Sequence, residues 1–307
     1  MKPAIERLGP LNWTSPLPDD VAENMNGATL MRVPDWVAAP LGRYYLYFAH
    51  HAGRYIRFAH ADRIEGPWTL REGGVLDMGE CPWAATHIAS PDIRIDHDAQ
   101  RIDLYFHGDM AEPKGQFTFR AESNDGVTFR PEPNRLGTFY FRTFDHGGEV
   151  YALGKARLYR STDGGRSFEV GHLAYPLSPE TPGQMGPQAL RHSAVIVEGD
   201  LAHVVFSRLE DAPESLRYGR MALSGDWRRW MISDCGILLA PDAEFEGGAL
   251  EIAPSDGGVT YDFVRQLRDP HVLWDEGAYH LVYSYGGESG LALARFAAFP
   301  EPFPARA

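Results

Sequence analysis

Four ionisable residues recur at one register along the chain. Asp35, Asp92, His192 and Asp269 each stand about a dozen residues before an apolar run that brings the chain back. A carboxylate or an imidazole can donate or accept a proton, so such groups aimed at one point could perform acid–base chemistry. The repeated register predicts that the fold gathers them at one place.

The segments between these residues are predicted to be short antiparallel strands. Alternating apolar residues at 44–49, 102–107 and 279–285 are typical of strands that are half buried between neighbouring sheets. Segments 123–129 and 161–168 both read Ser-x-Asp-Gly and end at Phe, which is typical of a tight turn followed by an aromatic anchor. No long amphipathic helix interrupts the pattern.

This repetition predicts an all-β fold, a five-bladed β-propeller whose four-stranded antiparallel blades surround a central funnel. Residues 1–307 are predicted to form one domain, because a closed ring of repeats can fill that length. We expect segment 1–27 to pack on the propeller or to close it, with the outer strand of the fifth blade coming from this segment.

Topology then predicts where side chains meet. In a four-stranded meander, the start of the first strand and the turn between the second and third strands lie at the same face. Carboxylates, imidazoles and aromatic rings at one mouth are typical of a pocket for a polyhydroxylated ligand, and we expect Trp83 to stack on a sugar ring. The predicted substrate-binding residues are His51, Trp83, His87, His107, Arg142, Arg191, His192, Arg268 and Asp269.

The chain resembles the five-bladed β-propeller glycosidases, a superfamily that includes glycoside hydrolase families 43, 32, 68, 117 and 130. Three short motifs carry this resemblance: Val-Pro-Asp-Trp at 33–36, Ser-Pro-Asp-Ile at 90–93 and Arg-Asp-Pro at 268–270. Each heads a repeat, and returns such as Tyr-Leu-Tyr-Phe at 45–48 follow. The resemblance implies a hydrolase of carbohydrate metabolism, similar to family 43, that cleaves a short oligosaccharide from its non-reducing end.

The resemblance also implies roles for particular carboxylates. In the arabinanase and xylosidase branch, an Asp of the first blade is the general base and an Asp of the second tunes the acid, which here would be Asp35 and Asp92. The third blade offers Arg142 where that branch has its catalytic Glu, so the acid must come from elsewhere. An inverting displacement with Asp35 as base is the default that follows.

Two glutamates are candidates for the acid, because glycosidic cleavage needs two carboxyl groups in opposite protonation states. Glu214 leads, since it ends the acid-rich turn 210–214, where like charges raise one pKa. Glu288 is the second candidate, because the glycines on either side of it permit close approach to a ligand. Together with Asp35 and Asp92, these form the predicted catalytic set.

Other interpretations stay open. A phosphorolytic or transferring relative would hold phosphate with Arg191, His192 and Arg268, and a sugar-binding propeller would need no catalytic carboxylate. Asp269 could simply pair with Arg268. His192 is either a buried histidine or a ligand of a central calcium or other divalent ion, although no cofactor is required by the predicted reaction. Arginines at similar registers also leave a sialidase-like site open.

Composition narrows the partners and the compartment. The net charge of −13 argues against nucleic acid and anionic membrane as partners, because the summed field repels polyanions. Segment 1–7 leads into no apolar stretch, so we expect neither a secretory signal nor a spanning helix. Two cysteines, Cys81 and Cys235, favour the reducing cytoplasm over a disulfide framework. A small carbohydrate is the expected partner.

Overall fold

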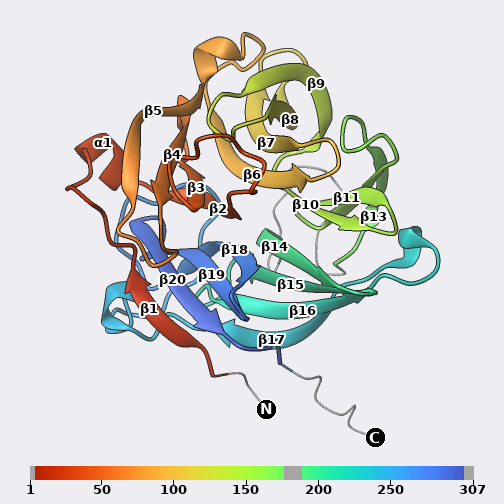
Figure 1. Cartoon of the computed structure of the whole chain (residues 1–307). Helices are drawn as coiled ribbons and strands as arrows, with labels where there is room; N and C mark the ends of the chain where they lie inside the picture. Colours follow the sequence, from red (N-terminus) through yellow and green to blue (C-terminus); the bar gives the residue numbers. More distant parts are fainter. Residues whose placement is uncertain (1–3, 176–188, 301–307) are drawn as a thin grey trace, which may run out of the picture.

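The computed structural model describes residues 4–175 and 189–300, which form five sheets of four antiparallel strands arranged in a ring (Figure 1). The predicted all-β, five-bladed β-propeller is therefore confirmed. β2, β6, β10, β14 and β18 each contact the next of these strands around the ring, so they surround the central axis. No helix of the described residues is long and apolar enough to cross a membrane.

Four blades are meanders in chain order, and the fifth takes its outer strand from the N-terminal segment. The first two blades are β2 (Asn26–Arg32), β3 (Tyr44–Ala49), β4 (Tyr55–Ala61) and β5 (Thr69–Asp77), then β6 (Ile88–Asp96), β7 (Arg101–Met110), β8 (Gly115–Ser123) and β9 (Arg130–Thr138). The third is β10 (Phe141–His146), β11 (Glu149–Gly154), β12 (Arg157–Ser161) and β13 (Glu169–Leu173). The last two are β14 (Leu190–Glu198), β15 (Leu201–Arg208), β16 (Leu216–Ala222) and β17 (Ser233–Leu239), then β18 (Leu267–Asp275), β19 (Ala278–Tyr285), β20 (Gly290–Phe296) and β1 (Glu6–Pro10).

Short helical turns lie outside the sheets: α1 (Asp19–Ala22), η1 (Met78–Glu80), η2 (Trp227–Arg229) and η3 (Glu244–Glu246). The core lies between blades, because the middle strands are covered on both faces, and every residue of β3 is buried. Aromatic rings fill these layers, with Tyr45 and Phe58 meeting edge to face at 4.9 Å.

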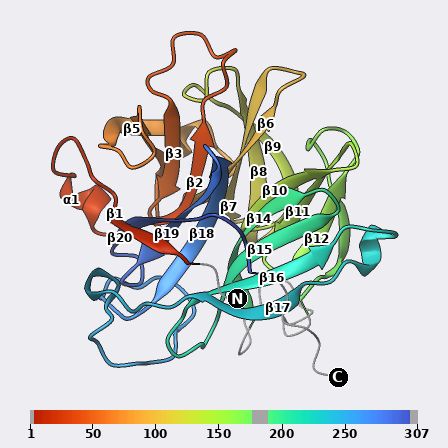
Figure 2. The same cartoon turned by 60° about the horizontal axis from the view of Figure 1, so that its bottom comes forward.

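Closure of the ring joins the two ends of the chain. β1 pairs antiparallel with β20, and Figure 2 shows the two strands side by side. Arg7 of β1 reaches inward, where its Nε donates to Glu246 Oε1 at 2.9 Å, and the Tyr283 hydroxyl donates to the same carboxylate at 2.8 Å. Strand pairing and a partly buried ion pair therefore tie β1 to the fifth blade and to η3.

The two matching turns predicted at 123–129 and 161–168 fold alike. In the first, Asp125 Oδ1 accepts hydrogen bonds from the amides of Val127 and Thr128, and Asp163 Oδ1 in the second accepts from those of Arg166 and Ser167. Each turn docks on a tyrosine of the preceding blade: the Tyr47 hydroxyl donates to the carbonyl of Gly126, and that of Tyr105 to Gly165. The turns therefore link successive blades.

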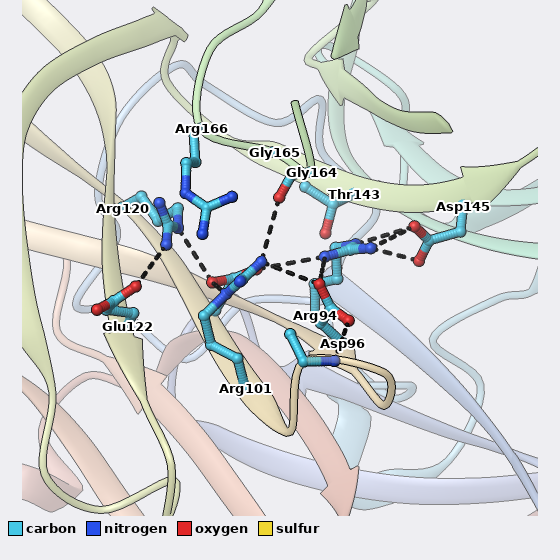
Figure 3. Close-up of polar contacts among 12 residues, drawn as sticks. Arg94, Asp96, Arg101, Arg120, Glu122, Thr143, Asp145, Gly164, Gly165 and Arg166 are labelled. Atoms are coloured by element: carbon cyan, nitrogen blue, oxygen red, sulfur yellow. Dashed lines mark hydrogen bonds and ion pairs between the residues drawn. The ribbon is translucent and has the colours of Figure 1, made fainter. Parts of the chain in front are cut away.

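A buried ion cluster adds a second link between the second and third blades (Figure 3). Asp103, which has no exposed surface, accepts from Arg101 Nε at 2.8 Å and from Arg120 Nε at 3.0 Å. Arg94 lies 3.3 Å from the same carboxylate and donates to Asp145 of β10. The shared carboxylate holds three guanidinium groups in place at this boundary.

Candidate functional site

The central axis has a cavity at each end. The inner strands start at the mouth, where a cavity of about 180 Å³ is lined by Asn26, His51, Ala89, Ser90, His107, Gln116, Phe139, Tyr140, Lys155, Arg191, His192 and Gly258. They end at the rear, where a cavity of about 520 Å³ is lined mainly by apolar residues of the same strands. We call these the mouth cavity and the rear cavity.

The inner strands are irregular at the mouth. In β2, β6, β14 and β18 the pairing with the next strand shifts register near the start, which is the signature of a bulge. Ser90, Tyr140 and Asp269 have left-handed φ values of 50°, 66° and 47° at or beside these starts. Such conformations are unusual for residues other than glycine and recur at functional sites, and Ser90 and Tyr140 do line the mouth cavity.

A chain of alternating charges connects two blades behind the mouth cavity. Arg191 Nη1 donates to Glu214 Oε2 at 3.0 Å, and Arg268 Nε donates to the same oxygen at 3.1 Å. Arg268 Nη1 then donates to Glu288 Oε1 at 3.0 Å. Glu214 is fully buried and Glu288 nearly so. The turns after β15 and β19 bring both to these arginines, but neither glutamate lines the mouth cavity.

Glu288 is held as a carboxylate. Its Oε2 accepts from the amide of Asn24 at 2.7 Å and from that of Asn26 at 3.2 Å, and His51 Nδ1 lies 3.5 Å away. Burial opposes ionisation, yet His51, Arg268 and Asn24 together lower the pKa of Glu288 to about 2. The group is therefore charged at neutral pH.

Asp269 is in the opposite situation. It is fully buried, and neither carboxyl oxygen has a hydrogen-bond partner among the described residues. Burial, followed by the charge of Glu288, raises the pKa of Asp269 to about 7. Its Oδ1 lies 3.6 Å from Nε2 of His192, which lines the mouth cavity. Asp269 is thus separated from the cavity only by the side chain of His192, and it can hold a proton near neutral pH.

Basic side chains occupy the cavity wall. Burial, and then the charge of Arg191, lowers the pKa of Lys155 to about 7, and the Lys155 Nζ lies 4.0 Å from the centre of the Phe139 ring. Burial and neighbouring cations lower the pKa values of His107 and His192 well below the usual range, so both imidazoles are neutral.

Five of the predicted substrate-binding residues lie at or beside the mouth cavity. His51, His107, Arg191 and His192 line the cavity, while the His87 ring meets that of His107 at 5.3 Å and its Nδ1 lies 3.3 Å from Asp109. Trp83 instead packs on Phe119, at 5.7 Å between ring centres, and is absent from the lining of the mouth cavity. The Trp83 ring therefore does not face this cavity, and a sugar bound there could not stack on it as expected.

The register expected for the first blade is wrong, and it displaces Asp35. The inner strand is Asn26–Arg32, so Asp35 follows its end instead of opening it, and the exposed Asp35 lines the rear cavity. The length of β2, at about 3.3 Å per residue, puts roughly 20 Å between the two ends. Asp35 and Glu214 therefore do not share a cavity, which corrects the predicted base–acid pair.

Asp92 and Arg142 also face the rear cavity. Asp92 Oδ2 accepts from the Thr143 amide at 2.8 Å and from its hydroxyl at 2.7 Å, while Arg142 Nη1 lies 3.6 Å from Oδ1. Arg142 donates to the carbonyl of Pro91 and to that of Ser193, which ties three inner strands together across the axis. These contacts give the two residues a structural place on the axis, away from the mouth cavity.

The sequence interpretation missed several residues at the mouth. Lys155 lies in the turn between the second and third strands of its blade, so the topological argument that selected His51 could have selected it too. Asn24 and Asn26, which bind Glu288, carry no such signal, because neutral amides are common in turns.

The surroundings of His192 do not fit the central cation considered from the sequence. Arg191, Arg268 and Lys155 all act on this imidazole, and their charges would repel a metal ion. Within the described ranges, 4–175 and 189–300, no group of three or more His, Cys, Asp or Glu side chains could hold a metal ion.

Comparison with known proteins places the chain in a family. No family model matches it. An uncharacterized protein of Acanthamoeba polyphaga mimivirus is 30% identical over 296 residues, which cover 89% of this chain and 83% of that protein. The chain belongs to the same family as this mimivirus protein.

Solved structures share the fold of this family member. A GH43_1 enzyme from Xanthomonas citri matches 98% of the chain and 96% of its own length, with a TM-score of 0.63 and 12% identity, and it has been solved with xylotriose. A GH130 structure, from a family of mannoside phosphorylases that contains glycoside hydrolases, matches 100% and 98% with a TM-score of 0.68 at 9% identity. CoXyl43, a compost metagenome β-xylosidase/α-arabinofuranosidase solved with xylotriose in a calcium-free form, matches 94% of each chain at 0.61 and 13%. The resemblance to five-bladed glycoside hydrolase propellers is thus confirmed for the fold.

Proposed function

We propose that this protein is a glycosidase that binds one sugar unit in the mouth cavity and cleaves the bond to it. One observation carries the proposal: Asp269 is a buried, unpartnered carboxyl with a pKa of about 7, and it lies beside His192 of the cavity wall. The shared fold with sugar-bound propellers supports the choice of ligand class. A cavity of about 180 Å³ is below the roughly 300–1,000 Å³ of drug-sized sites, which favours the end of a short oligosaccharide.

Two carboxyl groups with opposite pKa shifts supply the two roles that glycosidic cleavage needs. Asp269 holds the proton. It passes this proton to Nε2 of His192 while Nδ1 of the same ring releases its own proton to the departing oxygen, and the carbon–oxygen bond breaks with its electron pair on that oxygen. The oxygen of a water molecule forms the new bond to the anomeric carbon, and the released proton goes to His51, which lines the cavity. Glu288, 3.5 Å from Nδ1 of His51, is the charged group and stabilises the imidazolium that forms.

Two earlier alternatives lose support. Phosphorolysis would need free guanidinium donors, but those of Arg268 are taken by Glu214, Glu288 and Gln266, and Arg191 donates to Glu214 and to the carbonyls of Asp256 and Gly258. An inverting displacement with Asp35 as base would need that residue at the mouth, whereas it lines the rear cavity. The anomer that forms first shows whether the reaction inverts or retains the configuration of the anomeric carbon.

The test is hydrolysis of a panel of nitrophenyl glycosides and plant or algal oligosaccharides, with the first product anomer followed by NMR. On the best substrate we expect Asp269→Asn to lower kcat at least about 100-fold, because asparagine cannot supply the proton and still tolerates the left-handed backbone. Glu288→Gln should have a comparable effect. The matched control Asp35→Asn should leave activity unchanged.

Two results would overturn this function. Full activity in Asp269→Asn would show that Asp269 is not the proton donor. Loss of activity in Asp35→Asn would show that the reaction takes place in the rear cavity. Tight sugar binding without turnover of any substrate in the panel would instead favour a sugar-binding propeller.

A further inference from the structure

The wall of the mouth cavity is basic in a protein that is acidic overall. The chain carries a net charge of −13, yet five of the twelve lining residues are His, Lys or Arg, and no Asp or Glu of the described residues is among them. The five come from four different blades: His51 and Lys155 from turns, His107 from β7, and Arg191 with His192 from β14. They are brought together by closure of the ring, because they do not form a run of basic residues in the sequence.

The charges that act on His107 and His192 are mainly positive. After burial, the pKa of His107 is lowered by His87, His51 and Lys155, with only a smaller opposing contribution from Asp109. That of His192 is lowered by Arg191, Arg268 and Lys155. Each group that could be charged therefore weakens the ionisation of the next, and this part of the cavity lies at positive potential.

Two carboxylates reach this wall from behind. Glu288 Oε2 lies 3.5 Å from Nδ1 of His51, Glu214 accepts from Arg191, and both carboxylates also accept from Arg268. At Tyr140, which lines another part of the wall, burial and the charges of Asp269 and Glu288 raise the pKa of the phenol. Asp269 therefore lies toward Tyr140 and His192, whereas Lys155, whose pKa is lowered by burial and by Arg191, lies against Phe139 and acts on both His107 and His192.

We propose that the sugar recognised in the mouth cavity is acidic, and that Lys155, supported by His107 and His192, binds its carboxylate. The proposal rests on the glycosidase function only in taking the ligand to be a sugar. A carboxylate would stabilise the protonated form of Lys155 and accept a charge-assisted hydrogen bond from it, which is about twice as strong as a neutral one. A neutral sugar would leave the repulsion between Lys155 and Arg191 in place.

The experiment measures binding to the wild-type protein by calorimetry, with each uronic acid compared with its neutral parent. The pairs are galacturonic acid with galactose and glucuronic acid with glucose, and inorganic phosphate is titrated as a separate anion. We expect at least one uronic acid to bind about tenfold or more tightly than its parent, a difference of about 1.4 kcal/mol. Phosphate should compete only weakly.

Lys155→Met tests the assignment, because methionine keeps the length of the side chain and removes its charge. It should reduce the preference for the acidic sugar, measured as the ratio of the two affinities of one pair, about tenfold or more. The matched control is Lys114→Met, an exposed lysine between β7 and β8, which should keep the preference intact.

Three results would overturn the inference: equal affinity for acidic and neutral members of every pair, binding of phosphate alone, or an unchanged preference in Lys155→Met. Failure of the glycosidase function would look different. Uronic acid binding without cleavage of any glycoside would overturn that function and support the anionic ligand, whereas cleavage of neutral glycosides without uronic acid binding would do the reverse.

Discussion

Asp269 and Glu288 are both buried carboxyls at the mouth, but their pKa values move in opposite directions. Hydrogen-bond donors decide the difference: Glu288 accepts from Asn24, Asn26 and Arg268, while the oxygens of Asp269 have no donor among residues 4–175 and 189–300. Burial alone then favours the neutral acid at Asp269, and solvation by the protein favours the charged form at Glu288. Such a pair can divide the acid and base roles of one reaction.

The raised pKa of Asp269 predicts a stability change with pH. From about pH 4 to about pH 7 the folded protein keeps a proton that the unfolded chain releases, so this residue makes the folded state less stable as pH rises. Asp269→Asn removes the effect. In urea unfolding, the variant should match wild type near pH 4 and exceed it by up to about 4 kcal/mol at pH 7 and above, since each pKa unit corresponds to about 1.4 kcal/mol.

The control for this measurement is Asp35→Asn, which changes an exposed acid at the rear of the molecule. Its stability curve should run parallel to that of wild type across the same pH range. A parallel curve for Asp269→Asn as well would show that Asp269 ionises normally in the folded state and would contradict its assignment as the proton donor.

Neighbouring blades are joined by contacts that repeat from one blade to the next. Tyr47 and Tyr105 occupy equivalent strands and bind equivalent turns, at Gly126 and Gly165. Between the second and third blades the Asp103 cluster adds charge to this pattern. Buried guanidinium groups need this carboxylate, because an unpaired buried charge costs far more than an exposed one.

Asp103→Asn should therefore destabilise the protein by about 3–5 kcal/mol, since three arginines lose their shared charge. The measurement is urea unfolding at pH 7. Asp145→Asn is the matched control, because Asp145 also binds Arg94 but its side chain is 54% exposed, and it should cost less than about 1 kcal/mol. Equal effects of the two substitutions would show that burial does not determine the strength of this cluster.

The molecule as a whole depends on a closed ring. The mouth cavity collects residues from all five blades or the loops between them, so its geometry needs every blade in place. β1 completes the last blade by pairing with β20, and Leu11, which follows β1, is buried in the cluster between the fifth and first blades. Without β1, the outer edge of β20 would be an open template for pairing with another chain.

Removal of residues 1–12 should lower the free energy of unfolding by at least about 2 kcal/mol, the value of burying one leucine side chain, and should promote self-association. Urea unfolding and size-exclusion chromatography measure the two effects. Glu6→Gln, which removes only the exposed pair with Arg295, should change stability by less than about 1 kcal/mol. A truncated protein that stays monomeric with wild-type stability would show that β1 contributes little to closure.

The sequence by itself determined the strands, the matching turns and the number of blades, because alternation and turn chemistry act over a few residues. It also brought together Arg191 and His192, which line the mouth cavity, and Glu214, Glu288, Arg268 and Asp269 behind them, since a meander sets which turns share a face. Only the tertiary structure decided that Asp35 lies at the rear, as the first inner strand starts at Asn26 and its apolar pattern continues to Val37.

The tertiary structure also decided the chemistry of each carboxyl. Whether Glu288 keeps its charge depends on donors such as Asn24, from the segment before β2, and whether Asp269 holds a proton depends on how deeply closure of the ring buries it. Residues more than 200 positions apart meet only when the last blade packs on the first, for instance Asn24 and Glu288, which are 264 apart. The local sequence pattern does not contain the distances between such residues, so it predicted the strands and turns. The charge states of the carboxyl groups depend on how those elements assemble.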